Sequence, residues 1–292
     1  MKKFSFSGHE TFACKIYWLK KGYDFILSGK KFTDEDAVVE LGVGKNMVTS
    51  IRFWLKAFGI VDDNDETTQL ADYLFGDQGV DLYLEDPLSL WLLHYQLIKQ
   101  EKASIYSLVF NFFRRERAEF TREQLKKFLK RKIEENKGTF SEKTLDSDIK
   151  AFLNNYLSGN SNEVEEGFIN ILQELGLITS LKRHDDNDHL VEWYRFDTSP
   201  KQDLPIEALL YVILDNTDYG SSISLSSLAN DPTSLGNVFL LTETTLAQRL
   251  QQIPSAYGVY TETAGNPVLQ VNEGLDSIQL LRNYYEIENA GL

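Results

Sequence analysis

Residues 32–61 read FTDEDAVVELGVGKNMVTSIRFWLKAFGIV, and this stretch decides the fold of the N-terminal part. Thr33 can cap a short helix, and the three carboxylates after it suit the positive end of the helix dipole. The Gly-Val-Gly turn at 42–44 breaks that helix, because glycine adopts positive φ readily. Apolar positions then recur with a helical period over residues 46–58: Val48, Ile51, Leu55 and Phe58. The stretch therefore predicts a helix-turn-helix, with residues 59–61 beginning a wing.

The other faces of this second predicted helix carry polar side chains of the types that read DNA grooves: Lys45, Asn46, Thr49, Ser50, Arg52 and Lys56. An asparagine can bond an adenine edge in two places, and a helix start favours phosphate. We therefore expect Lys45 and Asn46 to contact bases or phosphates, Thr49 to lie on the same DNA-binding helix, and Arg52 and Lys56 to follow the DNA backbone. A helix-turn-helix can also act only as a packing or dimerisation element, so this alternative stays open.

Two further segments show the same order of predicted elements. Residues 120–196 hold a basic helix, two more helices and two strand-like runs, LITSLKR and HLVEWYRF, joined by the polar turn HDDND. Residues 205–272 hold three short helices followed by the hairpin GVYTETAGNPVLQVN. The predicted fold class is mainly α with small β wings, arranged as tandem winged helix-turn-helix-like domains. The expected domains are residues 1–100, 101–197 and 198–292.

Composition excludes several broad classes of protein. The chain has 292 residues, of which 42% are hydrophobic and 12% aromatic, so it can bury a sizeable core and is not disordered throughout. Its single cysteine, Cys14, permits no intramolecular disulfide, and the start MKKFSFSGHETF is too polar for a signal peptide. The sequence offers no apolar run of about 18 residues. We therefore expect a cytoplasmic protein with no membrane partner.

Charge is distributed unevenly along the chain. The formal net charge is -14, which argues against nucleic acid as a partner if it is taken as an average. Residues 1–60 nevertheless carry +4 and residues 102–137 carry +6, whereas residues 61–101, 138–195 and 196–292 are acidic. Two basic blocks of this kind suit a local DNA-binding face, although solvated helix faces produce similar runs. The acidic C-terminal third is better suited to docking another protein.

Few side chains are candidates for catalysis. His9 and Glu10 lie in the polar stretch FSGHETF, which could supply an acid-base or metal-binding element. Asp81, Glu85 and Asp86 precede His94 and could hold a divalent ion, although acidic residues ahead of a helix usually cap it or face solvent. The sequence contains neither a zinc-type spacing nor a P-loop, so zinc binding and nucleotide hydrolysis are disfavoured.

Four strings of the chain resemble a bacterial family catalogued as domain of unknown function four thousand and seven. They are FSGHETFACKIYWLKKGYDF, DAVVELGVGKNMVTSIRFWLKAFGIV, YLEDPLSLWLLHYQL and VFNFF. Members of that family occur with genes for DNA phosphorothioate modification, and the SspB-like branch is described as a DNA-nicking component. The resemblance implies DNA as a partner, together with a cysteine desulfurase, an ATP pyrophosphatase-like sulfur-transfer protein and an ATPase.

The same resemblance nominates site residues at the matching positions: Ser7, Gly8, His9, Glu10, Lys45, Asn46, Arg52, Glu85, Asp86 and His94. If the chain nicks DNA, His9 would act as general base or metal ligand. Glu10 with Glu85 or Asp86 would then hold Mg or Mn, while the first helix-turn-helix positions the strand.

Three hypotheses follow from the sequence. The first is a DNA-binding protein of a phosphorothioate modification or defence system, either a metal-dependent nickase or a recognition subunit. The second is a non-enzymatic helix-turn-helix transcriptional regulator. The third is a scaffold whose winged helices bind only proteins.

Overall fold

The computed structural model describes residues 4–157, 170–184, 188–263 and 265–290. The chain forms two compact units. The first unit comprises Met1–Leu84 and Gln96–Asp197, and the second comprises Glu85–Tyr95 and Thr198–Leu292. Helix α5 (Pro87–Gln100) supplies residues to both units.

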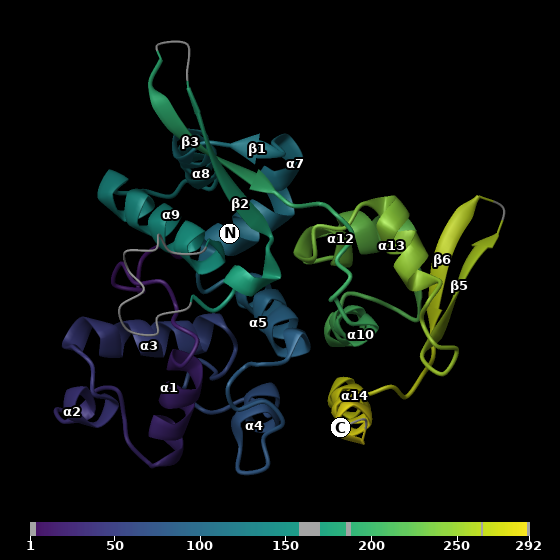
Figure 1. The fold of residues 1–292 in the computed structure, drawn as a ribbon, viewed down its shortest axis with the longest axis horizontal. Coiled ribbons are helices and arrows are strands. Elements are labelled where there is room, and N and C mark those ends of the chain that lie inside the picture. Colours follow the sequence, from purple (N-terminus) through teal and green to yellow (C-terminus); the bar gives the residue numbers. More distant parts are fainter. Residues whose placement is uncertain (1–3, 158–169, 185–187, 264, 291–292) are drawn as a thin grey trace. The chain divides into compact units, whose positions relative to one another are not determined.

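The N-terminal part of the first unit is a small helical bundle. It contains α1 (Trp18–Leu27), α2 (Ala37–Leu41), α3 (Lys45–Ala57) and α4 (Gln69–Phe75), drawn in purple and blue in Figure 1. Helix α2 ends at Gly42, whose φ of 62° lies in the left-handed region that glycine adopts without strain. Phe25, Ala37, Leu41 and Val48 form one buried cluster between these helices. The helices flanking the predicted glycine turn are therefore confirmed.

The expected wing after α3 is reduced to a single β-bridge. Val61 pairs with Thr67, and no strand forms there. Both Asn64 and Glu66 donate their backbone N–H groups to the Asp62 carboxylate, at 2.8 and 2.9 Å. This side-chain bonding closes the chain into a tight turn, because aspartate satisfies nearby backbone donors that a hairpin would otherwise pair.

The rest of the first unit is built from helices and one small sheet. Its elements are α6 (Ser104–Leu108), the π-helical turn η1 (Val109–Phe113), α7 (Arg114–Glu116), β1 (Glu119–Phe120), α8 (Arg122–Glu135), α9 (Glu142–Tyr156), the 3-10 turn η2 (Gln173–Leu175), β2 (Ile178–His184) and β3 (Leu190–Phe196). Thr121 and Gln124 form a reciprocal capping box that starts α8. The strands pair antiparallel in the order β1-β3-β2, so β2 and β3 form the predicted hairpin.

One predicted helix of this unit lies largely outside the described residues. It was expected over residues 163–176, and the described part of that range begins at Asn170. Asn170 bridges to Lys15, and the short turn η2 follows before Gly176 takes a left-handed φ of 58°.

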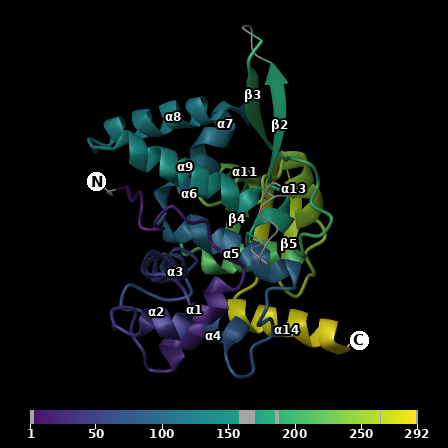
Figure 2. The ribbon, with the colours of Figure 1, turned by 60° about the vertical axis from the view of Figure 1, so that its left-hand side comes forward.

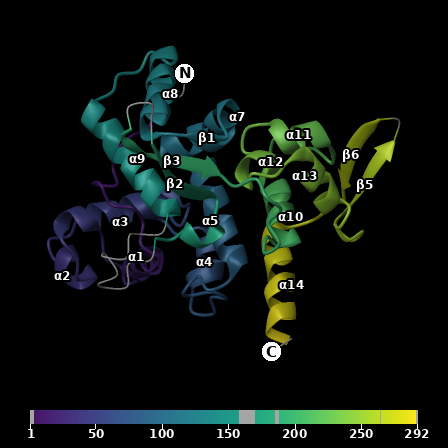
Figure 3. The same ribbon diagram turned by 45° about the horizontal axis from the view of Figure 1, so that its top comes forward.

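The second unit has its own helices and sheet. Its elements are α10 (Ile206–Asp215), β4 (Ser222–Ser224), α11 (Leu225–Asn230), α12 (Leu235–Val238), α13 (Glu243–Leu250), β5 (Gly258–Thr263), β6 (Asn266–Val271) and α14 (Ser277–Ala290). Figure 3 shows the β5–β6 hairpin of this unit and the terminal helix α14. The sheet is antiparallel in the order β4-β6-β5. Within this unit the Ser89 and Tyr285 hydroxyl oxygens lie 2.8 Å apart and link α5 to α14.

The predicted fold class, mainly α with small β wings, is confirmed at that level of detail. Among the described residues, none of the helices combines the length and the apolar character that a membrane span requires.

Candidate functional site

The polar motif of residues 6–12 forms a strained loop. Four of its residues have positive φ: Ser7 at 67°, Gly8 at 97°, Glu10 at 46° and Thr11 at 72°. Positive φ costs free energy for residues other than glycine, and it persists only where the surroundings impose it. Gly8 is also required sterically, because a Cβ at that position would lie 2.6 Å from the Phe53 ring. The loop is therefore held in its shape by contacts with other parts of the first unit.

One set of these contacts joins Ser7 and His9 to Asp148 of α9. Only 2% of His9 and 1% of Asp148 are exposed, and the His9 Nε2 and Asp148 Oδ1 atoms lie 3.3 Å apart. Both Asp148 carboxylate oxygens also accept the backbone N–H of Ser7 at 3.0 Å. The His9 ring stacks on Trp54, with ring centroids 5.9 Å apart and an interplanar angle of 23°. Among the described residues, neither ring nitrogen has an aligned hydrogen-bond partner.

Two helices hold the N-terminal segment, residues 4–15, on either side. On α3, the Ser50 hydroxyl donates to the His9 carbonyl at 3.0 Å, and Trp54 Nε1 donates to the Phe12 carbonyl at 3.1 Å. On α9, Asn155 Oδ1 accepts the Cys14 N–H at 2.9 Å. Figure 2 shows the purple N-terminal segment running between α3 and α9. The segment thus ties the helix-turn-helix to α9.

Ser50 was expected on a face of α3 away from the core, and this expectation is wrong because Ser50 is fully buried. The N-terminal segment covers that face of α3, so the helix is buried on two sides. Trp54 lies on the covered face as well, and its side chain is also fully buried. The remaining exposed surface of α3 is correspondingly narrow.

The burial of His9 bears on its nomination as a general base or metal ligand. A catalytic base must come within hydrogen-bond reach of the proton that it abstracts. With 2% of its surface exposed, His9 contacts Asp148 and two aromatic rings, and this geometry favours a structural role. Glu10, the next residue, is exposed.

The other nominated acidic residues belong to the second unit. Glu85 is exposed, whereas the Asp86 carboxylate accepts the Leu88 N–H at 2.7 Å at the start of α5 and the Tyr284 hydroxyl at 3.3 Å. His9 and Glu10 belong to the first unit. Within the described part of the chain, no group of three or more His, Cys, Asp or Glu side chains could hold a metal ion. Within each unit, the described part of the chain therefore does not gather the nominated residues into such a group.

His94 is a core residue of the second unit. It is fully buried on α5, and its Nε2 atom lies 2.8 Å from the Val238 carbonyl oxygen. Burial lowers the pKa of His94 to about 4, and the hydrogen bond to Val238 offsets only part of this shift. The imidazole is therefore neutral at pH 7.

The start of α3 presents the polar residues predicted to read DNA. Gly44 is extended and precedes the helix, and Lys45, Asn46 and Thr49 are exposed. The first turn of a helix has backbone N–H groups without intrahelical partners and carries a partial positive charge. A cationic side chain at such a helix start suits an anionic ligand such as phosphate.

Arg52 and Lys56, farther along α3, are already bound to an acidic residue. Arg52 Nη2 lies 2.6 Å from Asp65 Oδ2, and Lys56 Nζ lies 3.0 Å from Asp65 Oδ1. Burial raises the pKa of Asp65, but hydrogen bonds and charge from Arg52 and Lys56 outweigh it and leave the pKa below its usual value. Asp65 therefore neutralises part of the positive charge of both side chains, and the expected contacts of Arg52 and Lys56 with the DNA backbone did not include this pairing.

Arg52 lines a cavity of about 450 Å³, and two further cationic side chains line the same cavity. The turn after α1 contributes Lys30 and Lys31 to the cavity wall. Lys30 is paired with Glu40, whereas the Lys31 side chain is exposed and has no ion pair within the described ranges. Neither lysine was predicted from the sequence, although a basic pair directly after Gly29 is a visible signal for a cationic turn.

Most lysine and arginine side chains of the second basic block, residues 102–137, form ion pairs with acidic residues of the same unit. Lys126 of α8 pairs with Asp146 and Glu142 of α9, at 2.7 and 2.9 Å. Arg131 pairs with Glu116 at 2.5 Å. These ion pairs make α8 a weaker candidate for contacting phosphate than its charge alone indicates.

Comparisons with known proteins place the chain in a family. A model of the family described as protein of unknown function (DUF4007) matches residues 6–285. Two solved structures, described as the SspB crystal structure and the magnesium ion-bound SspB crystal structure, are each 28% identical to the chain. Each match covers 97% of this chain and 88% of the other, with TM-scores of 0.83 and 0.81. SspB is a protein of a phosphorothioation system. No curated protein matches. Because the family model covers nearly all of its residues, the chain belongs to the DUF4007 family.

Proposed function

We propose that this chain is a DNA-recognition component of a phosphorothioate modification or defence system. The observation that carries the proposal is the helix-turn-helix, in which α3 begins after a glycine turn with Lys45, Asn46 and Thr49 exposed. Similarity to SspB over 97% of the chain supports the biological setting. The partners implied by that setting are DNA, a cysteine desulfurase, an ATP pyrophosphatase-like protein and an ATPase.

The topology of the two sheets supports tandem winged-helix domains. In the first unit β1 precedes two helices and a hairpin, and its partner is the last strand, β3. In the second unit β4 precedes three short helices and a hairpin, and it also pairs with the last strand, β6. A strand that pairs with the outgoing arm of a later hairpin is the arrangement expected of a winged helix. The acidic charge of residues 196–292 suits a protein partner for the second unit.

Contact with DNA through α3 would use three kinds of group. The N–H groups of its first turn and Lys45 would bind phosphate, and Asn46 could bond a base edge. Lys31, from the turn after α1, would add a phosphate contact near Arg52. Phosphate contacts give most of the affinity and all of its salt dependence in such a complex.

Charge reversal at the helix start tests this contact. We expect Lys45→Glu to weaken duplex binding about tenfold at about 50 mM salt, because a cation contacting phosphate is replaced by a repelling carboxylate. The measurement is fluorescence anisotropy with a labelled duplex. Lys143→Glu is the matched control, since Lys143 is exposed at the start of α9 and makes no ion pair within the described residues. Equal weakening by both variants would show a general charge effect and contradict the proposal.

Freeing Arg52 and Lys56 from their ion pairs with Asp65 should strengthen the binding of a DNA duplex. Asp65→Asn removes the counter-charge, and asparagine tolerates the φ of 64° found at this position. We expect tighter duplex binding and a log-log salt slope steeper by about 1 to 2, one unit for each cation that gains a phosphate. Asp77→Asn changes the charge equally at an exposed position without an ion pair in the described chain. An unchanged slope in Asp65→Asn would place Arg52 and Lys56 outside the DNA contact.

Nicking activity is a second candidate, and the magnesium ion in one SspB structure is the observation that favours it. Incubation with supercoiled plasmid, with and without Mg or Mn, tests it directly. Because His9 is buried against Asp148, we expect a gel shift without conversion to open circles, with the chemistry performed by a partner protein. Metal-dependent open circles that are lost in Glu10→Gln would instead make the chain a nickase.

A further inference from the structure

Strand β5 forms an open edge of the sheet in the second unit. The strand order β4-β6-β5 gives β5 one neighbour, β6, with which it pairs antiparallel from Gly258 to Thr263. On the side away from β6, the backbone of residues 259–262 has no hydrogen-bond partner among the described residues. The unpaired N–H and C=O groups of an edge strand are a template on which another chain can add a strand.

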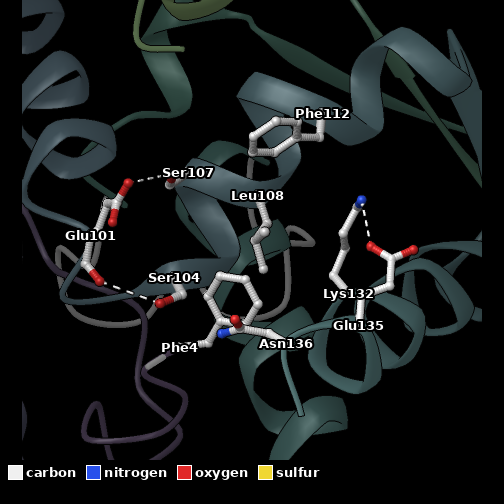
Figure 4. Close-up of a pocket in the computed structure, with 9 residues that line it drawn as sticks. All are labelled: Phe4, Glu101, Ser104, Ser107, Leu108, Phe112, Lys132, Glu135 and Asn136. Carbon is white, nitrogen blue, oxygen red and sulfur yellow. Dashed lines mark hydrogen bonds and ion pairs between the residues drawn. The ribbon is translucent and has the colours of Figure 1, made fainter. Parts of the chain in front are cut away.

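Polar groups that line the cavity of about 380 Å³ in the first unit bond instead to one another. Ser107 donates its hydroxyl to Glu101 at 3.3 Å, and Lys132 pairs with Glu135 at 2.8 Å (Figure 4). The edge of β5 differs from this cavity because its open groups belong to the backbone, which cannot turn away to find another partner.

The register of the sheet identifies the backbone groups that face outward. Residues of an antiparallel pair alternate between bonding to each other and pointing away from each other. The Val271 N–H donates at 2.8 Å to the carbonyl just before β4, so Val271 and its partner Gly258 point away from each other. By the same alternation, the N–H and C=O groups of Tyr260 and Glu262 face away from β6. The residue opposite Glu262 is Pro267, which has no N–H to donate.

The edge strand of the other sheet carries basic side chains, and β5 lacks them. Strand β2 ends in three exposed residues, Lys182, Arg183 and His184. Charged residues, lysine above all, discourage pairing at a sheet edge. Strand β5 has the sequence GVYTET, without lysine, arginine or proline, and 49% of Val259 is exposed. Valine, tyrosine and threonine favour strands, so β5 keeps the capacity to pair with another strand.

The charge of the second unit selects the kind of strand that fits. Residues 196–292 contain three Lys or Arg and twelve Asp or Glu. Two of the three cations are held within the unit: Lys201 is 7% exposed, and Arg249 donates to the Leu204 carbonyl. On β5 itself, Glu262 is exposed. A second copy of the chain or a nucleic acid would bring further negative charge to this edge, whereas a basic segment would be attracted to it.

We propose that the outer edge of β5 binds an extended basic segment of a partner protein, which adds a fourth strand to the sheet. The inference rests on the proposed role of the second unit in binding a protein. The backbone of the added strand would bond to Tyr260 and Glu262, and main-chain bonds of this kind supply affinity. Specificity would come from a lysine or arginine beside Glu262, because opposite charges on neighbouring strands stabilise their pairing.

NMR titration of the isotope-labelled full chain with capped peptides tests the site. The basic peptide acetyl-TKVKVT-amide should bind saturably at about 50 mM salt with a Kd on the order of 1 mM, and should shift the Tyr260 and Glu262 amide signals. The acidic peptide acetyl-TEVEVT-amide should bind at least about fivefold more weakly. The basic peptide with N-methylated central residues keeps its charge but cannot donate from its backbone, and we expect it to show no saturable binding.

Variants at Glu262 separate the effect of charge from that of strand pairing. Glu262→Lys should weaken binding of the basic peptide about fivefold, because like charges then face each other. Glu262→Pro removes the outward N–H and should abolish saturable binding, whereas an edge strand itself tolerates proline at such a position. Glu273→Lys is the matched control, since Glu273 is exposed just after β6 and lies outside the strands, and its affinity should stay within about twofold of the wild type.

Several results would overturn the proposal. They are absence of saturable binding, equal affinity for the N-methylated peptide, and wild-type affinity in Glu262→Pro. Saturable binding that shifts other amides of the second unit would overturn β5 as the site while leaving the unit a protein-binding module. A dimer in sedimentation experiments that is lost in Glu262→Pro would assign the edge to a second copy instead. The DNA contact through α3 is tested separately by Lys45→Glu, so either proposal can fail alone.

Discussion

Replacing Asp148 with alanine should lower the free energy of unfolding of the first unit by about 1–3 kcal/mol, the cost typical of leaving a hydrogen-bonding group inside the fold without its partner. The substitution leaves the Ser7 N–H without its acceptor and His9 without its carboxylate neighbour. The lost hydrogen bond is part-buried, so the Ser7 N–H regains only some of its hydration, and the buried His9 ring loses its polar neighbour. The loop of residues 6–12 should then lose the contact that maintains its positive φ values.

Asp146→Ala provides the control for this prediction. Asp146 lies on the same helix, and its carboxylate pairs with Lys126 at the surface, where 58% of its side chain is exposed. An exposed pair of this kind contributes only about 0–1 kcal/mol. Urea unfolding followed by tryptophan fluorescence suits the comparison, because Trp18, Trp54 and Trp193 lie in the first unit. Similar midpoints for the two variants would show that the buried pair does not hold the segment in place.

Lowering the pH from 7 to 4 should destabilise the second unit through His94. The folded pKa is about 4, whereas an unfolded histidine titrates near 6.5. As the pH falls below 6.5, His94 becomes protonated in the unfolded chain but stays neutral in the folded protein. The stability that depends on neutral His94 is therefore fully present above pH 6.5. It is then lost progressively down to about pH 4. A gap of this size corresponds to about 3 kcal/mol.

His94→Gln separates this effect from general acid unfolding. Glutamine keeps a donor for the Val238 carbonyl and does not titrate, so its contribution to stability should not change over this pH range. At pH 7 the variant should be less stable than the wild type, because the substitution alters the packing around this position. Thermal midpoints across this pH range should show the wild type losing more stability than the variant. Parallel curves for the two proteins would contradict a neutral buried histidine.

The helix-turn-helix could be predicted from the sequence because its determinants are local. Helix α2 ends at Gly42 and α3 begins at Lys45, and the period of apolar residues in α3 identifies its buried stripe. The wing after α3 was predicted wrongly for a local reason too. Asp62 bonds to two backbone N–H groups ahead of it and makes a turn that hydrophobicity patterns do not reveal.

The environment of His9 could not be predicted, because it depends on distant residues. FSGHETF is polar and contains a histidine beside a glutamate, so its composition indicates chemistry. The structure instead places His9 against Asp148, a partner 139 positions later in the chain, and no local pattern records that pairing. The ion pairs of Arg52 and Lys56 with Asp65 are nearer, and the acidic run DDND at residues 62–65 was a usable signal.

DNA binding by the full chain, measured as a function of salt concentration, tests the proposed phosphate contact at the start of α3. We predict that a labelled duplex binds at about 50 mM salt and that log K falls linearly with log salt concentration up to about 200 mM, with Lys45→Glu lowering both affinity and slope. This result would establish phosphate contact through the start of α3. No binding at about 50 mM salt, or binding that ignores both salt and Lys45→Glu, would contradict it.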